Sequence, residues 1–350
     1  MPAAEDSSFG DSTSAGRYAR QAALPAFGRA GQQKLSRSTV LVIGCGALGS
    51  TQAELLARAG IGKLILVDRD VLELNNLQRQ LLFDERDVRE RLPKPVAAAR
   101  RLKAINSEIA VEAAVADVTA RNVEDLLRPA DLALDGTDNI ETRYLLNDAA
   151  IRAGKPWIYG GVLGTAGTVM AVRPGEGPCL RCLFEEPPDA GGQPTCETQG
   201  VLNTAVAGVA ALQVTEALKL LVGDSAAEFK LHTLDVWRGS VGSIAVERRG
   251  SCVCCGQRRF EFLNAERGSS LTVLCGRNSV QVTPEARAAP DFAALSERLA
   301  PLGEVTLNGF VLEFVRGAYR LVVFPDGRVL VMGTTDTIEA RTLVAKYIGS

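Results

Sequence analysis

The sequence of 350 residues contains a single histidine, His232. Histidine is the side chain that enzymes use most often as a general acid or base, because its pKa lies near physiological pH. No serine or cysteine partner is implied near His232, which falls within a predicted strand at residues 229–237. We therefore expect His232 to be structural, and we assign it no acid–base function.

The sequence also lacks a strong excess of charge of either sign. Its 39 lysines and arginines and its 41 aspartates and glutamates give a formal net charge of -2. Proteins that bind nucleic acids through the phosphates usually present a basic surface. The overall charge therefore gives no reason to expect a nucleic acid as a partner.

An uninterrupted hydrophobic run of membrane length is absent. The longest apolar stretch covers residues 201–222, and it is interrupted by Asn203, Gln213, Glu216 and Lys219. A membrane-spanning helix needs about 20 apolar residues with few or no charges. We predict a helix in the protein core here, and no membrane partner.

The first 16 residues, MPAAEDSSFGDSTSAG, lack the basic start and the apolar centre of a secretory signal. Their small, polar and acidic composition is typical of a disordered tail. We expect the ordered chain to begin at residue 17 and the protein to reside in the cytoplasm. The 46% hydrophobic content is enough for one large domain and a smaller one.

A strand–turn–helix–strand pattern begins at residue 39. Residues 39–43 (TVLVI) form an apolar, β-branched run, and the sequence GCGALG follows at 44–49. Apolar residues then recur at helical spacing up to Gly60, and a second apolar run at 63–67 ends on Asp68. This pattern predicts a βαβ unit with a parallel sheet.

Gly44, Gly46 and Gly49 give the turn of this unit its chemical character. Glycine allows a tight strand-to-helix turn and lets a phosphate approach bare N–H groups at a helix N-terminus. Asp68, at the end of the next strand, is placed to bind a ribose. We predict a nucleotide site, although a tight turn without a ligand or an NAD-dependent oxidoreductase would show the same pattern.

The residues that follow favour a triphosphate over a dinucleotide. Residues 75–80 read NNLQRQ, and Lys94 precedes a predicted helix. The amide of Asn76, the guanidinium of Arg79 and the ammonium of Lys94 suit phosphate oxygens held while a P–O bond breaks. Hydride transfer gives no reason for such a cluster.

A second acidic stretch ends another predicted strand. Asp135 and Asp138 lie in the sequence DLALDGTDN at 131–139, at the sheet edge where open α/β folds bind their ligands. A carboxylate there offers the hard oxygen ligands that suit a metal ion on nucleotide phosphates. Alternatively, Asp138 or Asn139 caps the helix predicted to run through Ile151, and Asp135 caps the turn.

Four of the eight cysteines form two CxxC pairs, which are Cys179 with Cys182 and Cys252 with Cys255. Residues 183–251 separate the pairs, so they do not form a compact zinc finger. Four thiolates complete a tetrahedral zinc site with no open position, which is typical of a structural ion. Buried thiols or a redox pair are the alternatives, and Cys254 is left over.

Together these motifs resemble the ThiF/MoeB/HesA family, relatives of the ubiquitin-activating enzymes. The resemblance covers about residues 17–260 and includes the sequence YARQ at 18–21, which is similar to the family's Y-x-R-Q opening. It implies a homodimer in which Arg20 reaches the partner's ATP phosphates, magnesium bound by Asp138, and structural zinc on the cysteine pairs. It also implies adenylation of the C-terminal glycine of a small ubiquitin-like carrier protein.

The residues before Lys94 depart from the family's pattern, and Cys196 lies in a context that differs in function among family members. The family commonly reads G-x-P-K before its lysine, whereas this chain reads RERLPKP at 89–95. Cys196 lies in a T-C-x-x-x-G-V context in which some members form a thioester or acyl-disulfide with the carrier. A covalent role for Cys196 and an incidental loop thiol therefore both stay open.

Residues 266–350 show a different sequence pattern, with short strands and few helices. Strands are predicted around 271–274, 303–307, 310–315, 319–324 and 328–332, with helices at 291–299 and at the end of the chain. We predict a small α+β domain that resembles the C-terminal extension of some bacterial ThiF-like proteins. It contains no convincing catalytic group.

The sequence as a whole predicts a Rossmann-like, doubly wound, mostly parallel sheet with zinc-clipped loops (17–265), followed by the small α+β domain. The predicted activity is ATP- and magnesium-dependent adenylation of a Gly-Gly-ended sulfur carrier, with a sulfurtransferase as a possible further partner. The alternatives are adenylation followed by transfer to Cys196, an NAD-dependent oxidoreductase, and a nucleotide-binding scaffold without chemistry. Thiamine, molybdopterin and tRNA-thiolation pathways use similar activators, and the sequence does not indicate which carrier is activated.

Overall fold

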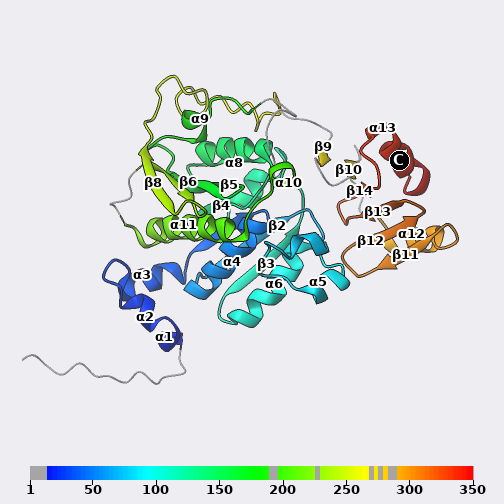
Figure 1. Ribbon diagram of the computed structural model, residues 1–350, viewed down its shortest axis with the longest axis horizontal. Coiled ribbons are helices and arrows are strands. Elements are labelled where there is room, and N and C mark those ends of the chain that lie inside the picture. The colour runs from blue at the N-terminus through cyan, green and yellow to red at the C-terminus, as the bar shows by residue number, and fades with distance from the viewer. Residues whose placement is uncertain are drawn as a thin grey trace, which may run out of the picture. The chain divides into compact units, whose positions relative to one another are not determined.

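The computed structural model describes residues 14–188, 196–224, 229–267, 272–274, 279–282 and 290–349. Internal contacts divide the chain into two compact units, labelled by element in Figure 1. The first unit contains the chain up to residue 69 together with residues 75–84 and 94–266. The second unit contains residues 70–74, 85–93 and the chain from residue 267 onward.

The first unit is built on an 8-stranded sheet with the order β3-β2-β1-β4-β5-β6-β7-β8. Its parallel half consists of β1 (Thr39–Ile43), β2 (Lys63–Asp68), β3 (Ala110–Val115), β4 (Leu132–Asp135) and β5 (Trp157–Leu163). Its antiparallel half continues with β6 (Ala166–Val172), β7 (Lys230–Asp235) and β8 (Ser240–Ala245). The predicted α/β fold with a mostly parallel sheet is confirmed.

Helices cover both faces of this sheet (Figure 1). One face carries α4 (Ala47–Ala59), α6 (Lys94–Ile105) and α11 (Asn203–Val222), and the other carries α7 (Val123–Leu127) and α8 (Ile140–Ala153). Strands β1, β2 and β4 are buried almost throughout, which explains their continuous apolar sequences. Strand β3, at the edge of the sheet, is partly exposed. Helix α4 ends where Gly60 takes the left-handed φ of +83°.

Helix α11 lies in the core of the first unit, as its interrupted apolar sequence predicts. It is long and apolar enough to cross a membrane by length and composition alone. In this fold it packs against α4, β5 and β6, and its polar residues Gln213 and Glu216 are buried there. Helix α11 is therefore a core helix of the α/β unit.

The described chain begins with three helices, α1 (Ser14–Arg17), α2 (Ala19–Ala22) and α3 (Gly28–Leu35). Tyr18 anchors this segment, since its hydroxyl accepts a hydrogen bond from Asn106 Nδ2 at 2.7 Å. Gln21 and Gln32 both donate to the carbonyl of Ala59, at 2.9 and 3.0 Å. The N-terminal segment is thereby tied to the end of α4.

The second unit is a small α+β fold, as predicted. Its 6-stranded antiparallel sheet has the order β11-β12-β13-β14-β10-β9. The strands are β9 (Thr272–Leu274), β10 (Ser279–Val282), β11 (Glu304–Leu307), β12 (Leu312–Arg316), β13 (Tyr319–Val323) and β14 (Val329–Met332). Helices α12 (Phe292–Leu299) and α13 (Thr337–Tyr347) pack on one face of this sheet and enclose its hydrophobic core.

Candidate nucleotide site and cysteine cluster

The three glycines of the turn after β1 have different structural demands. Gly44 has a φ of +89°, and a Cβ atom on it would lie 2.7 Å from the carbonyl oxygen of Gly136. A Cβ atom on Gly49 would lie 1.8 Å from the carbonyl oxygen of Gly44. Around Gly46 the nearest atoms to such a Cβ are 3.9 Å away. The fold itself requires Gly44 and Gly49, whereas Gly46 leaves room for a ligand beside the backbone.

Asp68 and Lys94 both lie within electrostatic reach of this turn. The Asp68 carboxylate accepts a hydrogen bond from the backbone N–H of Cys45 at 2.6 Å. Burial and the charge of Asp68 raise the pKa of the Cys45 thiol well above its usual value, and Lys94 opposes this shift. Lys94 is only 2% exposed at the start of α6. A carboxylate and an ammonium group therefore border the glycine turn.

The predicted phosphate ligands Asn76 and Arg79 are held by a common neighbour, Asn75. Asn76 closes the 3-10 helix η1 (Leu74–Asn76), is buried, and donates from Nδ2 to Asn75 Oδ1 at 2.9 Å. Arg79 Nη1 donates to the carbonyl of Asn75 at 3.0 Å. One short loop thus presents an amide and a guanidinium together.

Gln80 belongs to the same loop but was not among the residues predicted to bind a ligand. Its side chain is 3% exposed, and Oε1 has no hydrogen-bond partner among the described residues. Its Nε2 lies 3.9 Å from the position of a Cβ on Gly46. A buried polar atom without a partner is uncommon and marks a place where a ligand can supply one. The sequence signal was only the position of Gln80 beside Arg79.

Asp135 anchors the turn between β4 and α8. Its carboxylate is fully buried and accepts hydrogen bonds from the Thr137 N–H at 3.0 Å and from Arg143 Nε at 2.9 Å. Arg143 also donates to the carbonyl of Thr137 at 2.7 Å. Burial raises the pKa of Asp135, and the charge of Arg143 opposes the increase. Asp135 therefore caps the turn, and Arg143 is a partner that the sequence did not indicate.

Asp138 lies in this turn and is exposed, one residue before the helix cap. Asn139 is the N-cap of α8, and its side chain accepts a hydrogen bond from the Thr142 N–H at 3.1 Å. Burial acts to lower the pKa of Arg143, but Asp135, Tyr159 and Asp138 raise it. Capping of α8 does not require Asp138, whose charge lies near Arg143.

Two buried glutamines fix the end of β4 behind this turn. Gln52 Nε2 and Gln213 Nε2 both donate to the carbonyl of Asp135 at 2.9 Å. Gln52 Nε2 also donates to Gln213 Oε1 at 2.6 Å. Gln213, from α11, therefore satisfies backbone polar groups at the carboxyl end of the sheet.

Two predicted site residues, Arg20 and Cys196, lie on short helices outside the glycine turn. Arg20 is exposed on α2, and no hydrogen bond or ion pair in the described part of the chain links it to the glycine turn. Cys196 is the first residue of α10 (Cys196–Gln199), and its side chain lies outside the described residues. Its predicted covalent role is therefore not examined by this geometry.

The two CxxC pairs come together as predicted. The Sγ atoms of Cys179, Cys182, Cys252 and Cys255 all lie within 4.8 Å of one another, and all four residues are buried. Cys179 and Cys252 are 3.6 Å apart at Sγ, and Cys182 and Cys255 are 3.4 Å apart. Thiolates on one tetrahedral zinc ion, with Zn–S bonds of about 2.3 Å, lie about 3.8 Å apart. The cluster can hold a metal ion of this kind.

Helix α8 connects the two cysteine loops through Asn147. Its Oδ1 accepts a hydrogen bond from the Leu180 N–H at 2.9 Å, and its Nδ2 donates to Cys254 Sγ at 3.2 Å. The leftover cysteine, Cys254, is thus a buried neighbour of the cluster held by α8. The next residue, Asp148, accepts from the Phe262 N–H at 3.0 Å.

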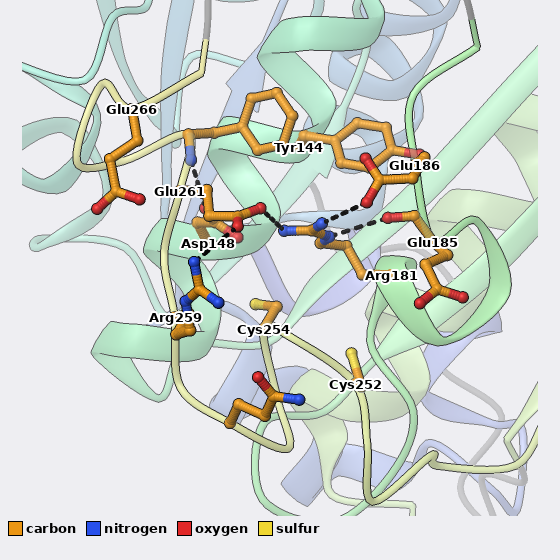
Figure 2. A network of polar contacts seen from close by, with 12 residues as sticks. Tyr144, Asp148, Arg181, Glu185, Glu186, Cys252, Cys254, Arg259, Glu261 and Glu266 are labelled. Carbon is orange, nitrogen blue, oxygen red and sulfur yellow. Dashed lines mark hydrogen bonds and ion pairs between the residues drawn. The ribbon is translucent and has the colours of Figure 1, made fainter.

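A buried arginine beside the cluster joins the same loops, and Figure 2 shows it between acidic side chains. Arg181 is 1% exposed, forms an ion pair with Glu261 at 2.9 Å, and lies 3.4 Å from Glu186. Its Nε donates to the carbonyl of Glu185 at 3.0 Å. Burial acts to lower the pKa of Arg181, but Glu261, Asp148 and Glu186 raise it. Fully paired, Arg181 fixes the residues around the first CxxC pair.

His232, which was expected to be structural, lies on β7. Its Nε2 is 3.7 Å from the carboxylate of Glu216 on α11. In the described residues, its one ion-pair partner therefore belongs to the core helix, away from the glycine turn after β1.

The sequence matches the model of the ThiF family over residues 18–254. The chain is 42% identical over 337 residues to a Bacillus subtilis protein named sulfur carrier protein ThiS adenylyltransferase, covering 95% of this chain and 99% of that protein. It is 40% identical over 246 residues to a Thermus thermophilus protein named sulfur carrier protein adenylyltransferase, covering 69% of this chain and 90% of that protein.

The fold is similar to that of a solved structure, E. coli MccB with ATP. The match has a TM-score of 0.58 and 25% sequence identity, and it covers 72% of this chain and 76% of the MccB chain. The family match at residues 18–254 includes the glycine turn and all strands of the 8-stranded sheet.

Proposed function

The chain belongs to the ThiF family, and we propose that it uses ATP to adenylate the C-terminal glycine of a ubiquitin-like sulfur-carrier protein. The observation that supports this most strongly is the 42% identity to a ThiS adenylyltransferase along 95% of the chain. The site agrees with it, since the glycine turn, Asp68 and Lys94 adjoin at the carboxyl ends of β1 and β2.

In the proposed reaction an oxygen of the carrier's terminal carboxylate attacks the α-phosphate of ATP. A bond forms between that oxygen and the α-phosphorus, the bond to the bridging β-phosphate oxygen breaks, and pyrophosphate leaves. The carboxylate is already a nucleophile, so the enzyme has to orient the groups and neutralise phosphate charge. This agrees with a site that contains no histidine.

Each candidate residue has a place in this proposal. Gly44, Gly46 and Gly49 form the turn that admits the phosphates, and Asp68 binds the ribose. Asn76, Arg79 and Lys94 hold phosphate oxygens, and the orphaned Oε1 of Gln80 is a further ligand contact. Arg20 completes the site of the partner subunit in a homodimer, consistent with its exposed position on α2.

Asp138 is the residue that we propose to bind magnesium. Its carboxylate is exposed at the end of β4, and the cap of α8 is supplied by Asn139 instead. A magnesium ion would neutralise charge on the phosphates, and carboxylate oxygen is a ligand it prefers. Arg143 offsets part of the carboxylate charge in the absence of nucleotide.

We propose that the four-cysteine cluster holds a structural zinc ion. Four sulfur ligands leave no open position for substrate, and the separations of 3.4 and 3.6 Å suit one shared ion. We place the protein in the cytoplasm, where thiols stay reduced and ATP is available. The metal would clip the loop after β6 to the loop after β8.

A ThiS-type carrier is the substrate that the comparisons favour. The relative with that name aligns along nearly the whole chain, including the second unit, whereas the Thermus thermophilus relative covers 69% of it. A sulfurtransferase would then replace AMP with sulfur on the carrier. Attack by Cys196 on the acyl-adenylate is the alternative next step, which would release AMP and form a thioester.

The proposal is tested by ATP–pyrophosphate exchange with a Gly-Gly-ended ThiS-type carrier. Exchange should require the carrier and should fall at least about 100-fold in Asp138→Ala, since electrostatic stabilisation of a transferring phosphoryl group is lost. Asp131→Ala, at the other end of β4, is the matched control and should keep the wild-type rate. Carrier-independent exchange, or full activity of Asp138→Ala, would contradict the proposal.

A carrier adduct cleaved by thiol reductant or by hydroxylamine would separate the two next steps. If Cys196 forms a covalent intermediate, the adduct disappears in Cys196→Ser while pyrophosphate exchange continues. An oxidoreductase would instead reduce NAD in the presence of substrate and show no exchange.

A further inference from the structure

The second unit includes two short segments that lie far from its other residues in the sequence. Residues 70–74 and 85–93 belong to this unit, whereas residues 75–84 between them and Lys94 after them belong to the first unit. The two segments pair with each other, because the Leu72 N–H donates to the carbonyl of Leu92 at 3.1 Å. The residues that flank the loop with Asn76 and Arg79 in the sequence therefore belong to the second unit.

Arg91, three residues before Lys94, has an unusual backbone conformation. Helix α5 (Glu85–Arg89) ends just before it, and Arg91 takes a φ of +50°. Its N–H donates to the carbonyl of Val88 at 3.0 Å, as at the left-handed residue that commonly follows a helix. Glycine is preferred at such positions, because other residues are strained there.

Contacts within the second unit stabilise Arg91 in this conformation. Its guanidinium forms an ion pair with Glu313 of β12 at 2.5 Å, and the Glu313 side chain is 6% exposed. The carbonyl of Arg91 accepts a hydrogen bond from Asn308 Nδ2 at 2.8 Å. Asn308 is itself fixed in the turn before β12, where its Oδ1 accepts from the Val311 N–H at 3.0 Å. A side-chain contact and a backbone contact thus act on one residue.

Glu313 forms ion pairs with two arginines on the face of the sheet opposite to α12 and α13. Its other carboxylate oxygen pairs with Arg320 of β13 at 3.0 Å. Leu72, Arg91, Glu313 and Arg320 line one small cavity of about 30 Å³. A nearly buried carboxylate between two arginines is expensive to remove from water unless both partners are present. Because the buried Glu313 carboxylate is stable only when it is paired, its ion pair with Arg91 holds residues 85–93 against this face.

We propose that Glu313, Asn308 and Arg91 are positioning residues for Lys94. They fix the chain in the left-handed turn from which Pro93 and Lys94 follow, and so set the reach of Lys94 toward the ATP phosphates. The inference rests on the role of Lys94 in the proposed function. It gives the second unit a part in nucleotide affinity.

The test compares Glu313→Gln with Asp326→Asn in the full-length protein. Glu313→Gln removes the charge that holds Arg91, and should raise KM for ATP about tenfold with the KM for the carrier within about twofold. Asp326→Asn is the control in the same unit, and it breaks the ion pair of 2.6 Å between Asp326 and the buried Arg328. In the described structure, Asp326 forms no hydrogen bond or ion pair with residues 85–93. Asp326→Asn should leave both KM values unchanged.

Rescue distinguishes positioning from general destabilisation. Adding Arg91→Gly to Glu313→Gln should restore most of the ATP affinity, because glycine adopts the left-handed turn without an ion pair. Equal KM shifts in Glu313→Gln and Asp326→Asn, or failure of Arg91→Gly to rescue, would overturn the proposal. Thermal unfolding of each variant confirms that the second unit is folded.

Calorimetric binding of Mg-ATP without carrier separates this proposal from the function on which it rests. A weaker Kd in Glu313→Gln supports positioning even if the wild-type protein exchanges no pyrophosphate, a result that would contradict adenylation alone. If Glu313→Gln keeps the wild-type Kd for Mg-ATP and the wild-type KM for ATP while pyrophosphate exchange is normal, the positioning proposal is overturned. The proposed adenylation would then still hold.

Discussion

At the scale of single residues, the three glycines of the turn after β1 look equivalent in the sequence, but the structure constrains them differently. Gly44 and Gly49 lie so close to neighbouring backbone that any side chain would clash. Gly46 has a negative φ, and a Cβ on it would meet nothing within 3.9 Å. The fold therefore demands the first two, and we propose that Gly46 serves the close approach of the nucleotide.

Gly46→Ala and Gly49→Ala form a matched pair that tests this division. Gly49→Ala should lower the free energy of unfolding by about 3 kcal/mol, because its Cβ would overlap the Gly44 carbonyl. Gly46→Ala should unfold like the wild type but lose at least about tenfold in ATP affinity. Denaturant unfolding and calorimetric ATP binding measure the two effects. A destabilised Gly46→Ala, or one with normal ATP affinity, would contradict the assignment.

The buried pair of Asp135 and Arg143 acts on the same scale. Asp135→Ala leaves the guanidinium of Arg143, 16% exposed, without its carboxylate partner. The expected loss is about 3–5 kcal/mol in the free energy of unfolding, as for other broken buried ion pairs. Chemical denaturation measures it, and Arg152→Ala, which removes an exposed pair with Glu124, is the control with a loss of about 1 kcal/mol or less. Similar losses in both variants would show that burial of the first pair has no special importance.

At the scale of elements, α8 has a double role. Its N-terminus follows the turn that presents Asp138, and its middle turn holds both cysteine loops through Asn147. The sequence predicted the helix and the cluster of four cysteines. It could not indicate Asn147, Arg143 or Gln80, because each takes its meaning from residues that are distant in the chain.

Zinc content tests the cysteine cluster as an element that joins two loops. Metal analysis should find about one zinc ion per chain in the wild type and much less in Cys182→Ser. Cys254→Ser should retain the ion, since Cys254 hydrogen-bonds to Asn147 and lies outside the set of four. Removal of the metal by a chelator should lower the melting temperature, because the two loops lose their link. Stoichiometric zinc in Cys182→Ser would contradict the site.

At the scale of the whole molecule, the strands and helices of the α/β fold followed from local sequence patterns. The runs at β1 and β2, the glycine turn and the break at Gly60 each have a local physical cause. Strand β10 (Ser279–Val282) was not predicted, because four residues are too few for its alternation of polar and apolar residues to stand out from the neighbouring sequence. The inclusion of residues 70–74 and 85–93 in the second unit also had no local signal, since it depends on Asn308 and Glu313.

The proposed homodimer is tested by complementation between two inactive variants. Arg20→Ala and Asp138→Ala carry different affinity tags, are expressed together, and are purified through both tags. If Arg20 serves the partner subunit, each mixed dimer contains one intact site and should have about half of the wild-type exchange rate. Each variant alone should be inactive. Mixed dimers as inactive as both parents would show that Arg20 does not act across an interface.

The most direct test of the central claim is the mass of the carrier after reaction. A Gly-Gly-ended ThiS-type carrier, incubated with magnesium, ATP and the enzyme, is examined by intact-mass spectrometry with pyrophosphatase present. We predict a gain of one AMP group on the carrier's C-terminal glycine, and none on a carrier with a C-terminal amide. An unmodified carrier, or AMP attached elsewhere than at that carboxylate, would contradict the account.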